Sequence, residues 1–101
     1  MESLRIDKWL WFARFCKSRS LAQQMVDGGE VRQNGRPVSK ASTTVKAGDE
    51  LIFPLGRSRR RVRVLDLGSR RGPASEARTL YEELPLPAET GFDPPEKAFE
   101  R

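Results

Sequence analysis

The sequence contains no histidine and a single cysteine, Cys16. Without histidine, these 101 residues offer no imidazole for acid–base catalysis and no zinc site of the Cys/His type. A lone cysteine excludes a disulfide within the chain and favours a reducing compartment, so we expect a cytoplasmic protein. No nucleophile–base pair or cluster of metal ligands is visible, and we therefore expect no enzyme activity, no cofactor and no metal.

Long apolar runs are also missing from the sequence. Apolar residues make up 37% of the chain, and the mean hydropathy is −0.65. No stretch approaches the roughly 20 apolar residues of a membrane-spanning helix, and the first residues lack the apolar segment of a secretory signal. We expect no membrane partner, and one domain with a small core.

Positive charge is what the chain has in excess, mostly as arginine. Lysine and arginine total 19 against 14 acidic residues, and 14 of the 19 are arginine. The net charge is +9 for residues 1–81 and −4 for residues 82–101. This distribution favours a polyanion partner, and arginine favours bidentate phosphate contacts. We divide the chain into a nucleic-acid-binding domain (1–84) and an acidic, proline-rich tail (85–101) that we expect to be extended or disordered.

Two short amphipathic helices are predicted near the N-terminus. The first has an apolar stripe at i, i+3, i+4 and i+7, formed by Ile6, Trp9, Leu10 and Ala13. The second covers about 19–27, with an apolar arc of Leu21, Ala22, Met25 and Val26. Ser18 is the predicted N-cap, with Ser20 and Gln23 as a weaker capping pair, and the two glycines at 28 and 29 end the helix.

The turn between these helices contains Lys17, Ser18 and Arg19. Two cations and a hydroxyl next to a helix N-terminus form an environment that attracts phosphate. The alternative is a solvated, well-capped turn without a ligand, which is the commoner meaning of so short a motif taken alone.

A small sheet is predicted downstream. Asn34-Gly35 predicts a type I′ hairpin between strands at 30–33 and 36–38. A short strand at 45–47 and a strand at 50–53 should follow, the second ended by Pro54 and Gly56. The arginine-rich run at 57–63 should pass into another strand, with a flexible hairpin as the alternative. Residues 74–83 have helical composition.

Four motifs in register resemble the small RNA-binding domain named for the fourth small-subunit ribosomal protein, the S-four domain. They are R-I-D-K-W-L-W, R-x-x-K-S-R-S-L-A, G-G-x-V-x-x-N-G and V-x-x-G-D-E-L, over residues 5–53. The resemblance implies an α+β fold, with two N-terminal helices packed on a small, mostly antiparallel sheet. We expect residues 54–84 to add a strand and a short C-terminal helix. It also implies that the helical face and the adjoining hairpin contact structured RNA.

The N-terminal motif and a second one, R-R-G-P-A-S-E-A-x-x-L-Y-E-E, are similar to the bacterial fifteen-kilodalton heat-shock protein family. This resemblance implies a ribosome-associated stress or recycling factor that binds ribosomal RNA of the large subunit. We expect a monomer. The chain departs from the family pattern near its end, where an acidic, proline-rich segment stands in place of a basic extension.

Ten residues are predicted to contact RNA. The family motifs supply Arg5, Arg14, Lys17, Ser18, Arg19 and Asn34. Exposure and charge add Lys8, Gln23, Arg32 and Lys40.

Four further residues of the first helix and its turn have other predicted roles. Asp7 is expected to cap the helix or to orient an arginine, and Trp9 to lie in the core. Trp11 and Phe15 could stack on bases. We favour the alternative that the segment around Leu80 and Tyr81 covers them.

Three other functions compete with this interpretation. The same domain could serve another ribosomal or tRNA process. A helix-turn-helix DNA-binding protein shares two helices and a basic turn, but the predicted hairpin fits that class poorly. An RNA-modifying enzyme would need a catalytic domain for which this sequence has no room.

Overall fold

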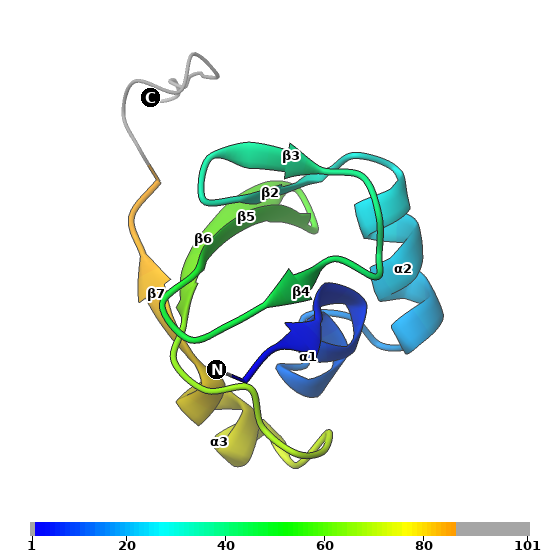
Figure 1. Ribbon diagram of the computed structural model, residues 1–101. Coiled ribbons are helices and arrows are strands. Elements are labelled where there is room, and N and C mark those ends of the chain that lie inside the picture. Colours follow the sequence, from blue (N-terminus) through cyan, green and yellow to red (C-terminus); the bar gives the residue numbers. More distant parts are fainter. Residues whose placement is uncertain (1, 87–101) are drawn as a thin grey trace.

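The computed structural model describes residues 2–86, which form an α+β fold (Figure 1). The acidic tail was expected to be extended or disordered, but its residues 87–101 lie outside the described residues. The helices and strands follow in this order: β1 Leu4–Arg5, α1 Ile6–Phe12, α2 Arg19–Asp27, β2 Val31–Gln33, β3 Arg36–Val38, β4 Thr44–Val45, β5 Glu50–Leu55, β6 Ser58–Val64, α3 Ala74–Ala77, a 3-10 turn η1 Arg78–Leu80 and β7 Tyr81–Leu84.

Five strands form an antiparallel sheet in the order β3-β2-β5-β6-β7. Strand β1 pairs with β4 in a separate two-stranded ribbon. Figure 1 shows the helices gathered on one side of the larger sheet, with the ribbon beside α1. The fold expected from the sequence is therefore confirmed.

The core lies between the helices and the inner face of the sheet. The apolar stripe of α1 is buried as predicted, and Trp9, which is fully buried, donates its indole N–H to the Asp66 carbonyl at 2.9 Å. The inner face of the sheet contributes five side chains that are 0% exposed: Val31, Leu51, Phe53, Val62 and Val64. Because successive strand residues alternate between faces, the residues between them face away from this core.

The turn between β2 and β3 has the predicted hairpin geometry. Asn34 and Gly35 both have positive φ, 53° and 86°, which a type I′ turn requires at its two central residues. The register places Gln33 opposite Arg36 and Val31 opposite Val38.

Two predictions for the secondary structure were wrong, and one strand was missed. Residues 81–84 form strand β7 rather than a helix, because helix α3 ends at Ala77 and the chain then pairs with β6. Strand β5 continues through Pro54 to Leu55, since β2 pairs only with Leu51 and Ile52 and leaves Pro54 at an edge position. Residues 4–5 form β1, a short strand that the sequence did not predict.

The predicted apolar arc of α2 was wrong at Leu21. Ala22 and Val26 are 0% exposed, whereas Leu21 is 47% exposed and Met25 is half-buried. Helix α2 therefore buries a narrower stripe than its sequence suggests, because it covers only the edge of the core beside α1.

Candidate nucleic-acid interface

A buried carboxylate organises the cations beside the N-terminus of α2. The Asp7 side chain is 2% exposed and accepts hydrogen bonds from Arg5 Nε at 3.1 Å and Arg5 Nη2 at 3.0 Å. Arg19 Nε lies 3.8 Å from the same carboxylate. The bond to Asp7 raises the pKa of Arg5 above its ordinary value. Asp7 thus orients an arginine, one of its two predicted roles, and holds two guanidinium groups from different elements together.

The N-terminus of α2 adds hydrogen-bond donors to this cluster. Ser18 is the N-cap, as predicted, and its Oγ accepts from the Leu21 amide at 3.1 Å. Lys17 precedes it and is exposed. The combination of Arg5 and Arg19 at Asp7, the N-terminus of α2 and Lys17 creates a positive potential that suits a phosphate group.

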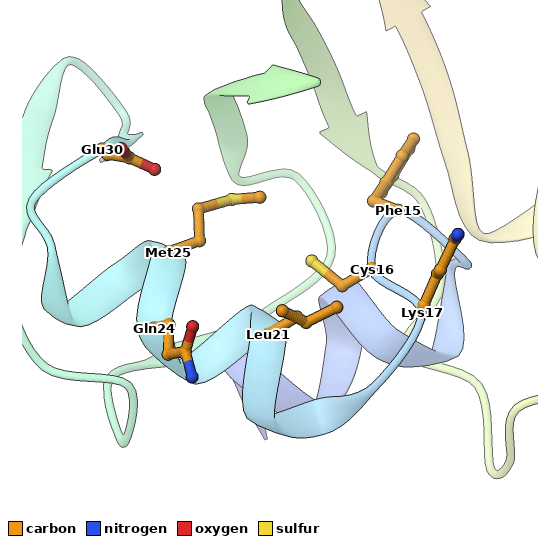
Figure 2. A pocket seen from close by; sticks show the side chains of 7 residues that line it. All are labelled: Phe15, Cys16, Lys17, Leu21, Gln24, Met25 and Glu30. Carbon is orange, nitrogen blue, oxygen red and sulfur yellow. The ribbon is translucent and has the colours of Figure 1, made fainter. Parts of the chain in front are cut away.

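The 15–17 turn and α2 enclose an apolar hollow next to this end of the helix. Figure 2 shows Leu21 and Met25 on the side of α2 that faces Phe15 and Cys16, with Lys17 at the opposite rim from Glu30. Burial raises the pKa of the Cys16 thiol to about 11, so this thiol stays protonated and unreactive at neutral pH. Exposed Leu21 lines this hollow instead of the core.

The loop at 39–43 connects the hairpin to β4 and carries Lys40. Ile6 donates its amide to the Thr43 carbonyl at 2.7 Å, and the Ala41 amide donates to Asp27 Oδ1 at 3.2 Å. The loop therefore joins the end of α2 to the start of α1. Lys40, exposed, also lines a hollow with Asn34 and Arg36 of the hairpin.

Asn34 is tied into the hairpin by its own side chain. Its Nδ2 donates to Asp49 Oδ1 at 3.2 Å, and its Oδ1 accepts from the Glu50 amide at 2.9 Å. These bonds give Asn34 a structural role, and its predicted contact with RNA stays a prediction. Arg36, which the sequence argument missed, is exposed in the same hollow. The hairpin motif could have identified it, since the residue after Asn34-Gly35 starts the return strand.

Four predicted residues neither contact the Asp7 carboxylate nor line the hairpin hollow. Arg32 is exposed and lines a hollow with Pro54 and Arg59 on the outer side of the sheet, and Gln23 is exposed on α2. Lys8 lies over the Phe12 ring, 5.6 Å from its centroid. Arg14, the fourth of these residues, faces the C-terminal segment. Its Nε donates to the Gly72 carbonyl at 2.7 Å.

The C-terminal segment covers the two aromatic residues left open by the sequence. Phe15 is 8% exposed, and its ring lies 4.6 Å from that of Tyr81. Trp11 is half-buried under Arg71, whose Nε also donates to the Trp11 carbonyl at 3.0 Å. The alternative that we favoured therefore holds for Phe15, whereas Trp11 contacts Arg71 rather than the segment around Leu80 and Tyr81.

The arginine-rich run forms strand β6, and three of its arginines are bound by acids. Arg61 and Arg63 contact Glu50 at 2.6 and 3.4 Å, and Arg63 also contacts Glu82 at 3.0 Å. Their hydrogen bonds, led by that of Arg61, lower the pKa of Glu50. Arg60 pairs with Glu83. The densest charge in the sequence is thus partly neutralised.

Other kinds of site find no support in the part of the chain that the structure describes. Residues 2–86 contain no group of three or more cysteine or acidic side chains placed to hold a metal ion. Within the same residues, no helix has the length and apolar character needed to cross a membrane.

Comparison with known proteins identifies the class first. Residues 4–51 match the family model described as the S4 domain. Together with the two helices, the sheet and the hairpin, this match defines an S4-domain protein.

Individual relatives narrow this class to a smaller family of S4-domain proteins. Heat shock protein 15 of Escherichia coli K12 is 48% identical over 80 residues, which are 79% of this chain and 59% of that protein. The RQC P-site tRNA stabilizing factor of Halalkalibacterium halodurans is 38% identical over 79 residues, which are 78% of this chain and 88% of that protein. A trimeric structure of Vibrio cholerae heat shock protein 15 has a TM-score of 0.78 and 41% identity, covering 82% of this chain and 83% of that one.

The chain therefore belongs to the heat shock protein 15 family of S4-domain proteins. It spans 59% of the length of the E. coli relative. The trimeric state of the V. cholerae structure gives no support to our expectation of a monomer.

Proposed function

We propose that this protein binds structured ribosomal RNA on the large ribosomal subunit and acts there as a non-catalytic stress or recycling factor in the cytoplasm. The observation that carries the proposal is the Asp7 carboxylate, which holds Arg5 and Arg19 beside the capped N-terminus of α2. A buried acid that fixes two exposed guanidinium groups prepares them for phosphate before RNA arrives, so less side-chain freedom is lost on binding.

The names of the relatives support a ribosomal partner. One group is named for stabilizing P-site tRNA, and a P-site is part of a ribosome. The other group is named for heat shock. These names describe stabilizing and stress proteins rather than enzymes. A contact with tRNA is the second candidate function, because the same cationic surface suits the phosphates of ribosomal RNA and of tRNA.

The mechanism needs only phosphate neutralisation and shape recognition. Arg5, Arg19 and Lys17 supply charge, the free amides of α2 supply short-range donors, and the hairpin hollow with Lys40 extends the surface. Folded RNA presents phosphates at fixed separations, so a rigid set of cations recognises its shape without reading base sequence.

The test is a binding comparison at one salt concentration among purified large subunits, small subunits and duplex DNA. We expect the tightest binding to large subunits, and a cross-linking map on them should place the contacts at residues 5, 17 and 19. Equal affinity for duplex DNA would contradict RNA recognition and favour the helix-turn-helix alternative. Preference for small subunits would contradict only the assignment to the large subunit and would leave RNA recognition standing.

A further inference from the structure

A cleft of about 170 Å³ lies where the end of α1 meets the C-terminal segment. Figure 1 shows α3 next to the end of α1 and below β7. Three arginines line the cleft: Arg14 from the turn after α1, Arg60 from β6 and Arg78 from η1. Its other walls include Phe15, Leu55 and Tyr81. Three cations from three separate elements thus converge on an apolar floor.

Arg14 is held in place by both its backbone and its side chain. Its φ of 66° lies in the left-handed region, which costs a non-glycine residue roughly 1 kcal/mol. Its Nε donates to the Gly72 carbonyl at 2.7 Å, which leaves the terminal nitrogens with donors for a ligand. A costly conformation at an arginine, where glycine would adopt it more easily, indicates that the side chain is needed there.

Arg60 is fixed in a similar way on the opposite wall. Its guanidinium lies 5.8 Å from the centroid of the Phe15 ring, and its Nε donates to Glu83 at 2.7 Å. The hydrogen bond to Glu83 is the main cause that raises the pKa of Arg60, and Tyr81 adds to it.

The cleft has an excess of positive charge. Arg78 is exposed and has no carboxylate partner within residues 2–86. Glu83 is the one acid that pairs with any of the three arginines in the described part of the chain. Two positive charges therefore remain without compensation, over a surface whose apolar floor strengthens their attraction for an anion.

We propose that this cleft is a second RNA contact, which binds a backbone phosphate between Arg14 and Arg78. The inference rests on the proposed function and extends it from Arg14 to Arg78, which lies outside the 4–51 match to the S4 domain. Guanidinium groups present paired N–H donors that match phosphate oxygens. Phe15 and Leu55 leave few competing polar groups, so a diester phosphate is the ligand that this chemistry fits.

The test compares Arg78→Ala, Arg78→Lys and Arg57→Ala for binding to purified large subunits over a range of salt concentrations. Arg78→Ala should weaken binding about tenfold at low salt and reduce the steepness of the log–log salt dependence by about 1. Arg78→Lys should keep the steepness. Arg57 is exposed on the β5–β6 turn and does not line the cleft, so Arg57→Ala should change both quantities little.

Two outcomes would overturn the cleft while the proposed function stands. Arg78→Ala could bind like the wild type although Arg19→Ala is weakened, or Arg57→Ala could lose as much affinity as Arg78→Ala, which would reveal only the effect of total charge. Failure of the wild-type protein to bind large subunits would instead overturn the proposed function, and the cleft's RNA ligand with it. Thermal midpoints of all variants should agree, since Arg78 has no partner whose loss would destabilise the fold.

Discussion

The role of single residues is clearest at Asp7, because burial and pairing occur at one side chain. A carboxylate that is 2% exposed would be costly without compensation, and Arg5 supplies two hydrogen bonds. Arg19 is the looser partner, at 3.8 Å and 44% exposed. The geometry therefore distinguishes an arginine that stabilises the buried acid from one that remains available to a ligand.

Arg19→Ala should weaken binding to structured RNA about 5- to 30-fold, the effect of one charge-assisted contact of about 1–2 kcal/mol. The fold should survive, because Arg5 still satisfies Asp7. Titration of variant and wild type against the same RNA, with thermal midpoints measured in parallel, checks both statements. A markedly lower midpoint would show that Arg19 is structural.

The exposure of Leu21 reverses what its sequence pattern predicts for stability. Leu21→Ala should change the free energy of unfolding by only about 0.5 kcal/mol, as for most surface positions. Leu10→Ala removes the same atoms from a side chain that is 0% exposed and should cost about 2–5 kcal/mol. Urea unfolding of the two variants gives the comparison, and equal losses would contradict the position of Leu21 outside the core.

Among the elements, two turns of the sheet are joined through Asp49. Its side chain is 6% exposed, and its carboxylate accepts from Gln33 and Asn34 of the hairpin and from Lys46 of the preceding turn. Burial, the largest single influence, raises the pKa of Asp49, but the hydrogen bonds together outweigh it and lower the pKa below its ordinary value. The ionised form is therefore the one that the fold prefers.

This preference predicts a loss of stability in acid. Because the folded pKa is depressed, the contribution of Asp49 is complete above the unfolded pKa of about 4 and is lost as the pH falls through the folded value. Asp49→Asn should cost about 1–3 kcal/mol at pH 7 and should lose less stability than the wild type between pH 5 and pH 3. Parallel acid slopes for the two proteins would show that other carboxylates cause the loss.

Strand β7 should restrain RNA binding through its acids. Glu83→Gln removes the partner of Arg60 and should tighten RNA binding a few-fold at low salt, because no neighbouring carboxylate of the described residues then offsets the charge of Arg60. The exposed pair should contribute less than about 1 kcal/mol to stability. Glu2→Gln makes the same charge change at an exposed residue that forms no ion pair among residues 2–86. Equal tightening by both variants would contradict a specific effect of β7.

Local sequence patterns correctly predicted the features that depend only on neighbouring residues. The stripe of α1, the Ser18 cap and the Asn34-Gly35 turn depend on residues within a few positions of each other, and all three were correct. Strand β7 was missed because residues 81–84 are held by pairing with β6, and Leu21 because its exposure depends on how α2 meets α1. The residues of the Asp7 cluster were each predicted to have a role, but the contact between Asp7 and Arg19 was not predicted. This pairing depends on how two helices meet across a turn.

On the scale of the whole molecule, positive charge is divided between anchored and open positions. The arginines of β6 mostly face Glu50, Glu82 and Glu83, whereas the exposed Lys17 and Lys40 form no ion pair within the described part of the chain. The net +9 of residues 1–81 thus overstates the charge available to RNA. A count of phosphate contacts is a better measure than the total.

That count can be measured from the salt dependence of binding. The Asp7 cluster, the hairpin hollow and the Arg14–Arg78 cleft together offer places for several phosphates, so the log–log slope against salt concentration should be roughly −3 to −6. A slope near −9 would mean that the β6 arginines leave their carboxylates and join the contact. A flat dependence would contradict electrostatic binding altogether. Titrations against one structured RNA at five salt concentrations, repeated with Arg19→Ala, decide among these values, since losing one phosphate contact should change the slope by about 1.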